Sequence, residues 1–136
     1  MDAELQSLQF EYNELCQRIK PSNGKYTILT EREDVGVAHI EFSDGQYHYI
    51  VTERGLDLET RSTGDRSDIL YWMVYDLTFW MGVAYEFENR IDGPDVRRKI
   101  FAHQIEMMKR ADHHFARRLE IEIAETLIRN PFVYHA

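Results

Sequence analysis

Apolar residues recur near the start of the chain with the spacing of one helical face. Their positions differ by three or four residues: Leu5, Leu8, Tyr12, Leu15 and Ile19. This spacing predicts an amphipathic helix that ends at Pro21, within a turn over residues 21–24. Alternating residues at positions 26–29 then predict a short strand, followed by a loop over residues 30–34.

The dipeptide Asp44-Gly45 lies between two runs of β-forming residues, which is typical of a two-residue type I′ hairpin. If Ser43 pairs with Gln46, one face of this hairpin is wholly apolar or aromatic: Ala38, Ile40, Phe42, Tyr47, Tyr49 and Val51. We expect this face to point to the core, because a slip of one residue would mix the two faces. The other face, which we expect to point outward, carries Val37, His39, Glu41, His48, Ile50 and Thr52.

A second turn over residues 53–55 leads into residues 56–60, where Leu56 and Leu58 alternate with acidic residues. The chain from the first strand to this point therefore predicts an antiparallel meander of three to four strands.

The apolar pattern changes to a helical one after Asp65, which we expect to cap a helix with Asp68 in its first turn. Between Ile69 and Tyr85 the only charged residue is Asp76. A helix that is apolar on nearly every side is buried on several sides. We therefore expect this helix to lie across the sheet.

Two further helices are predicted after the turn at residues 92–95. The first carries an apolar stripe that begins at Val96, and the second, capped by Asp112, repeats an apolar residue every four positions from Phe115. Pro131 is expected to stop the second helix.

This order of elements is typical of an α+β fold. It consists of an N-terminal helix, an antiparallel meander and then three helices packed on the sheet, as a single domain over residues 1–136. A composition of 43% hydrophobic and 29% charged residues fits one compact domain and excludes a disordered or collagen-like chain. The first ten residues lack the pattern of a secretory signal, and the single Cys16 fits a reducing compartment, so we expect a cytoplasmic location.

The negative charge is concentrated in one stretch of the chain. The net charge is −8, and residues 31–68, with ten acidic and four basic side chains, contribute −6 of it. An acidic surface repels phosphate, which argues against nucleic acid or an anionic membrane as the partner. It suits a basic protein partner.

Few residues suggest chemistry. No common catalytic or nucleotide-binding motif occurs, and we expect no catalytic residue and no cofactor. His39, Glu41 and His48 share a predicted face and could hold Zn²⁺, but ordinary polar cover is the preferred interpretation, with no metal. Asp76 could be a catalytic acid, but we expect a buried structural charge paired with Arg97 or Arg98.

Several runs of the sequence resemble a family of bacterial immunity proteins, number sixty-three among those of the polymorphic toxin systems. The runs are YHYIVTERG (47–55), ILYW (69–72), DLTF (76–79), GPDVRR (93–98) and NPF (130–132). The resemblance implies a protein made beside a toxin, whose toxic C-terminal domain it binds and neutralises without being an enzyme. It also implies toxins delivered by type VI secretion, often on Rhs carriers, or by contact-dependent systems.

The acidic meander is the interface that we predict for such a partner, because acidic residues speed association with basic surfaces. The predicted contact residues are His39, Glu41, Asp44, His48, Ile50, Glu53, Asp57 and Glu59, with Glu31, Glu33 and Asp34 extending the rim. The alternatives are a solvated acidic face with docking through the helices, a ligand-binding module or small enzyme with a pocket around Asp76, and a structural adaptor. A basic nuclease, deaminase or ADP-ribosyltransferase would each be a compatible toxin.

Overall fold

The computed structural model describes residues 2–20, 35–54 and 56–135. The chain's internal contacts divide it into two compact units. The sheet unit comprises Met1–Glu14 and Asn23–Trp72, and the helical unit comprises Leu15–Ser22 and Met73–Ala136. The turn, strand and loop predicted over residues 21–34 lie outside the described residues, and one domain over the whole chain stays a prediction.

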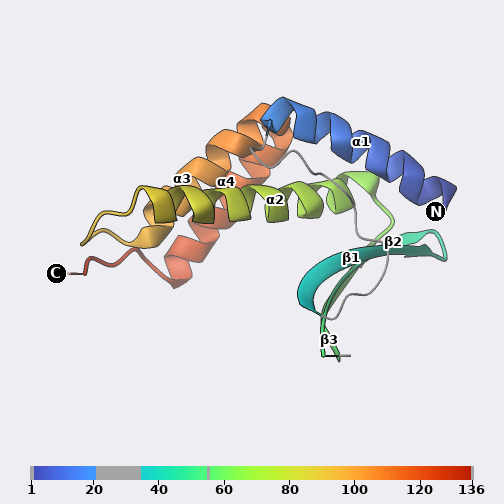
Figure 1. Cartoon of the computed structure of the whole chain (residues 1–136), viewed down its shortest axis with the longest axis horizontal. Coiled ribbons are helices and arrows are strands. Elements are labelled where there is room, and N and C mark those ends of the chain that lie inside the picture. Colours follow the sequence, from blue (N-terminus) through green and yellow to red (C-terminus); the bar gives the residue numbers. More distant parts are fainter. Residues whose placement is uncertain (1, 21–34, 55, 136) are drawn as a thin grey trace. The chain divides into compact units, whose positions relative to one another are not determined.

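Three antiparallel strands form the sheet, in the order β1-β2-β3 (Figure 1). They are β1 (Val35–Ser43), β2 (Gln46–Glu53) and β3 (Leu56–Thr63). Ser43 pairs with Gln46, so the predicted register is confirmed along the hairpin. Asp44 and Gly45 have φ angles of 54° and 73°, the left-handed values that a type I′ turn requires.

Burial divides the two faces of the hairpin less cleanly than alternation predicts. Ile40, Tyr47 and Tyr49 are buried on the predicted core face, as expected. His39, Ile50 and Thr52 are also buried, although all three lie on the face that was predicted to point outward, so that prediction is wrong at these positions. Alternation shows which residues share a face, but it does not show which faces are covered.

Helix α1 (Ala3–Ile19) carries the predicted apolar stripe, and the stripe is buried throughout: Leu5, Leu8, Tyr12, Leu15 and Ile19. The helix begins beside Asp2, whose carboxylate accepts a hydrogen bond from the Glu4 backbone N–H at 2.7 Å. This bond satisfies one of the unpaired N–H groups of the first turn.

Helix α2 (Arg66–Glu88) starts where it is predicted, with the Ser67 backbone N–H donating to Asp65 at 2.7 Å. Its first turns are buried around Ile69 and Val74, as the apolar run predicts. Its second half is not buried all round: Trp80 is 61% exposed and Phe87 73% exposed. The predicted burial on nearly all sides is therefore wrong for the C-terminal half of α2.

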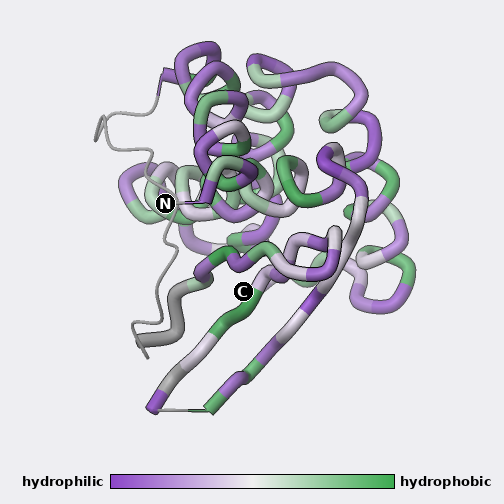
Figure 2. Tube along the Cα trace, turned by 90° about the vertical axis from the view of Figure 1, so that its right-hand side faces the viewer, coloured by the Kyte–Doolittle hydropathy of each residue, from purple (hydrophilic) through white to green (hydrophobic). Residues whose placement is uncertain are grey.

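Helices α3 (Val96–Ala111) and α4 (His113–Arg129) lie side by side within the helical unit (Figure 1). Hydrophilic and hydrophobic segments alternate along the helical turns of the chain, as amphipathic helices require (Figure 2). Asp95 and Asp112 cap them, with side chains that accept from the backbone N–H groups of Arg97 and Phe115. The described elements confirm the α+β class with an N-terminal helix, a three-stranded meander and three helices. Among these elements, no helix is both long and apolar enough to span a bilayer.

Candidate functional site

Several of the acidic residues predicted to form the interface are exposed. Glu41, Asp44, Asp57 and Glu59 all lie on the surface of the sheet unit. Glu53 ends β2, and its side chain is outside the described part of the chain, as are Glu31, Glu33 and Asp34. The exposed acids therefore gather on the tip of the β1–β2 hairpin and on β3.

Two of the three residues predicted to form the less polar centre of that interface are buried. His39 is 1% exposed and Ile50 is 7% exposed, so both offer a partner little surface, and the interface itself stays a prediction. The His39 ring instead bonds internally, with Nε2 2.6 Å from the Glu41 carboxylate. Both side chains therefore belong to the interior of the sheet unit rather than to its exposed surface.

His48 is half-exposed, and its ring is held by two serine hydroxyls. Nε2 lies 2.9 Å from Ser43 Oγ, and Nδ1 lies 2.7 Å from Ser62 Oγ. The zinc alternative needed His39, Glu41 and His48 as one ligand set. Within residues 2–20, 35–54 and 56–135, no three His, Cys, Asp or Glu side chains come together as a possible metal site.

The exposed part of β3 forms a different kind of surface, which we call the β3 edge and define as residues 56–60. All five residues are exposed, including two leucines: Leu56 at 67% and Leu58 at 59%. Asp57 and Glu59 are placed between and beside them. Large exposed apolar side chains on an outermost strand are unusual, because they favour pairing with another chain.

A β-bulge shapes this edge. Val51 pairs with Glu59, whereas the next residue, Thr52, pairs with Asp57. Leu58 is therefore the extra residue on β3, left without a directly paired residue on β2. A bulge of this type increases the local twist and changes the direction of the side chains around it.

An arginine anchors the strand just beyond the edge. The Arg61 guanidinium lies over the rings of Tyr49 and Trp72, 4.7 and 4.6 Å from their centroids. Its Nε is 2.8 Å from Glu59 Oε1, an ion-pair distance without the alignment of a hydrogen bond. A cation–π contact of this kind stabilises by about 1 kcal/mol or more where the guanidinium is partly desolvated. These contacts fix β3 on its neighbours within the sheet unit.

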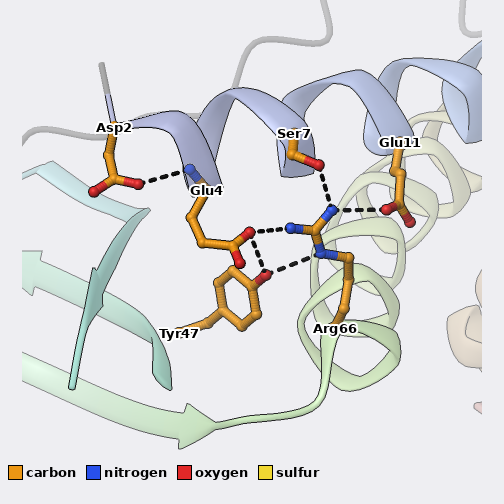
Figure 3. A network of polar contacts seen from close by, with 6 residues as sticks. All are labelled: Asp2, Glu4, Ser7, Glu11, Tyr47 and Arg66. Carbon is orange, nitrogen blue, oxygen red and sulfur yellow. Dashed lines mark hydrogen bonds and ion pairs between the residues drawn. The ribbon is translucent and has the colours of Figure 1, made fainter. Parts of the chain in front are cut away.

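A second arginine, Arg66, joins three elements of the sheet unit at one point (Figure 3). Its Nη1 donates to Ser7 and Glu11, both at 2.7 Å, and its Nε donates to the Tyr47 hydroxyl at 2.9 Å. Its Nη2 donates to Glu4, which also accepts a hydrogen bond from the Tyr47 hydroxyl at 3.2 Å. The contacts hold the start of α1 to β2 and to the first turn of α2.

The Arg66 cluster also changes the acidity of its own members. Burial alone would lower the pKa of Arg66, but hydrogen bonds with Glu11 and Tyr47 outweigh it and raise the pKa above its ordinary value. Burial raises the pKa of Tyr47, against the opposing effect of Arg66. Arg66 is therefore a permanent cation and Tyr47 a neutral hydroxyl. This cluster could not be predicted from the sequence, since its members are up to 62 residues apart.

In the helical unit, two of the runs that carry the family resemblance meet at Asp95. This buried carboxylate accepts from Arg97 Nη2 at 2.9 Å and from the Val133 backbone N–H at 3.1 Å. Arg97 in turn donates to the backbone carbonyls of Asn130 and Pro131, at 3.0 and 2.9 Å. The arrangement fastens the last residues of the chain to the start of α3.

A glycine allows the final residues to come close. Gly93 has a φ of 108°, and a Cβ at this position would lie 2.6 Å from the Tyr134 hydroxyl. The His135 backbone N–H donates to the Gly93 carbonyl at 2.6 Å. Any side chain at position 93 would therefore be strained and would also displace Tyr134.

Comparison with known proteins decides the family. Residues 43–125, more than half of the chain, match the family described as Immunity protein 63. The chain belongs to the Immunity protein 63 family. No curated protein and no solved structure matches it.

The part of the chain that matches the Immunity protein 63 family includes β2, β3, α2 and α3 and most of α4. The β3 edge, Arg61 and Arg66 lie within it, whereas α1 and nearly all of β1 precede it. The matched region therefore contains the exposed acidic and apolar strand as well as the anchor behind it.

Asp76 was predicted to be the buried charge of this immunity-family chain, but the structure buries other carboxylates. Asp76 is half-buried, whereas Glu86 and Asp95, also in the helical unit, are buried. Arg97 pairs with Asp95, its neighbour two residues away, and Arg98 is exposed with its guanidinium 4.2 Å from the centroid of the Phe132 ring. Pairing of Asp76 with either arginine stays a prediction.

A small cavity lies beside this junction in the helical unit. It measures about 30 Å³ and is lined by Glu86, Ile91, Pro94, Asp95, Val96, Arg98 and Lys99. A volume of this size holds about one water molecule. It is too small for an organic substrate.

Proposed function

We propose that this chain is an immunity protein that binds the toxic domain of a cognate bacterial toxin and blocks it by direct contact, with no reaction of its own. Its membership of the Immunity protein 63 family carries the proposal. Its place of action is the cytoplasm of the producing cell. The toxin there is one delivered by type VI secretion, on an Rhs carrier or by a contact-dependent system.

The charge distribution supports a basic toxin as the partner. Residues 31–68 carry −6 of the net charge of −8, and the described acids among them include exposed side chains on β3 and at the hairpin tip. Enzymes that act on nucleic acid or on dinucleotides have basic clefts, because their substrates are polyanions. Acidic side chains on an inhibitor raise the rate of association with such clefts and disfavour wrong partners. The proposed toxin is a nuclease, a deaminase or an ADP-ribosyltransferase, and neither nucleic acid nor membrane is a partner.

The internal polar clusters support a role as a rigid scaffold. The side chains of Arg66, Asp95 and Arg97 form hydrogen bonds with other parts of the same chain. An inhibitor benefits from such fixed geometry, because less conformational entropy is lost when a pre-organised surface binds.

The direct test looks for a toxin in the reading frames that neighbour this gene. The C-terminal domain of that toxin, on the order of 100 residues, is expressed in a susceptible host with and without this chain. We expect co-expression to restore growth and the two proteins to purify together as a complex. A toxin domain from an unrelated system serves as the specificity control. Growth arrest despite soluble expression of this chain, with no complex formed, would overturn the proposal.

A further inference from the structure

We propose that the toxin docks on the β3 edge by adding a strand of its own to the sheet, and that this strand alternates basic with apolar side chains. The inference rests on the proposed function and specifies which surface of the chain performs it. The toxin strand would extend the order β1-β2-β3 by one position beyond β3.

The first argument is that the β3 edge is exposed. β3 is the outermost strand of the described sheet, and residues 56–60 are all exposed. Leu56 and Leu58 are both largely exposed on this strand, and their apolar side chains lose contact with water only if a partner covers them. Strand addition supplies such a cover, because backbone hydrogen bonds give affinity while alternate side chains give specificity.

The second argument is the charge pattern of the β3 edge, which determines what kind of strand can pair with it. If two copies of β3 paired in antiparallel fashion about Leu58, Asp57 of one copy would face Glu59 of the other. Like charges directly opposite one another destabilise a strand pair. The same two carboxylates attract lysine or arginine on a toxin strand. The edge therefore discriminates against a second copy of this chain and in favour of a basic strand.

The third argument is that the strand is pre-organised. Arg61, stacked on Tyr49 and Trp72, anchors β3 immediately after the edge. Its ion pair with Glu59 also restrains one of the two carboxylates of the edge. A strand that is already anchored loses less entropy when another strand pairs with it.

The test compares variants of the edge with matched variants of α4. Leu56→Ser with Leu58→Ser removes the apolar contacts, and Asp57→Asn with Glu59→Gln removes the charges without changing the size of the side chains. The controls are Ile121→Ser with Ile128→Ser, and Glu120→Gln with Glu125→Gln, all at exposed positions of α4. Each variant is checked for folding by circular dichroism and then titrated with the purified toxin domain by calorimetry.

We expect the leucine pair to weaken binding about 100-fold, because desolvated apolar anchors dominate the affinity of interfaces. The charge pair should slow association by about tenfold at low salt and less at high salt. Both α4 controls should bind as the wild type does. In hydrogen–deuterium exchange, backbone amides of residues 56–60 should exchange at least about tenfold more slowly in the complex, which contact through side chains alone would not produce.

Two results would overturn the inference alone. One is unchanged toxin binding by the β3 variants together with unprotected β3 amides. The other is a wild-type chain that is dimeric without toxin and becomes monomeric on Leu56→Ser with Leu58→Ser, which would assign the edge to a second copy. A wild-type chain that fails to bind or neutralise the toxin would instead overturn the proposed function, and this inference with it.

Discussion

The N-terminal and C-terminal segments of the chain are each held by one charged side chain, a cation in the first case and an anion in the second. In the sheet unit, the cation Arg66 binds the start of α1 through the side chains of Glu4, Ser7 and Glu11. In the helical unit, the anion Asp95 binds the last residues through the Val133 backbone N–H and through Arg97. The first centre relies on side-chain partners, and the second relies largely on backbone groups.

Because of this difference, the two attachments should respond differently to salt and to pH. The side chains of Glu4 and Glu11 are 39% and 44% exposed, so salt screens their attraction to Arg66. Asp95 is buried, and its partners are held in place by the fold. Its hydrogen bonds with Arg97 and with backbone N–H groups lower the pKa of the carboxyl well below its ordinary value. The N-terminal attachment should therefore respond to salt, and the C-terminal attachment to acid.

The largest effect on stability is expected from Arg66→Met, which keeps most of the side-chain length and removes every hydrogen bond. The variant leaves Glu4 and Glu11 without their common cation and the buried Tyr47 hydroxyl with one partner fewer. We expect the free energy of unfolding to fall by about 2 kcal/mol, the usual scale for hydrogen bonds that involve charged groups. Urea denaturation followed by circular dichroism measures the change.

Arg117→Met is the matched control for this substitution, since Arg117 is exposed on α4. It should change the free energy of unfolding by less than about 0.5 kcal/mol. If the two variants were equally stable, the Arg66 cluster would contribute nothing beyond a surface charge.

The Arg66 cluster is a part of the structure that could not be predicted from the sequence. The α1 stripe and the hairpin register were predicted correctly because both follow from periodicity and turn chemistry within about twenty residues. Arg66 and Glu4 are 62 residues apart, and no local pattern pairs one arginine with one glutamate over that distance. The Asp95 capping position was readable as the end of a turn, but its contact with Val133 was not.

The candidate site shows the same limit on the sheet. Alternation placed His39 and Ile50 on the face with Glu41 and His48, and the register confirms that placement. Their burial depends on what covers the face, which the spacing of residues does not contain. The leucines of β3 were visible as alternating with acids, but only the structure shows that Leu56 and Leu58 are exposed.

The second effect, smaller than that of Arg66→Met, is the acid-induced release of the C-terminal residues. The ordinary pKa of Asp95 is 3.8, and its folded pKa is far lower. A carboxyl with a lowered pKa stabilises the attached state fully above its ordinary pKa, and the stabilisation is lost as the pH falls toward the folded value. We therefore expect the Tyr134 ring signals to remain native at pH 5 and to approach those of a free chain as the pH drops below about 3.8.

Asp95→Ser tests whether this carboxyl is responsible. Serine still caps α3 but cannot pair with Arg97, so the C-terminal residues should be released already at neutral pH and be cut faster by protease. Asp112→Ser is the matched control, because Asp112 caps α4 through Phe115 and its side chain does not hold the C-terminal residues. It should alter stability by about 0.5 kcal/mol or less. Equal release of the C-terminal residues in both variants would assign the attachment to capping alone.

The smallest effect is expected from Glu11→Gln, which removes one charge from the Arg66 cluster and keeps a hydrogen-bonding group. A partly exposed ion pair contributes about 0.5 kcal/mol at low ionic strength. In about 1 M NaCl the screening length shrinks to roughly 3 Å, so the difference from wild type should fall to about half or less. Glu125→Gln on α4 provides the baseline for removing an exposed acid. A loss of stability that stays the same across this salt range would mean that Glu11 acts through hydrogen bonding rather than through its charge. The N-terminal and C-terminal segments would then both be held by hydrogen bonds that salt does not weaken.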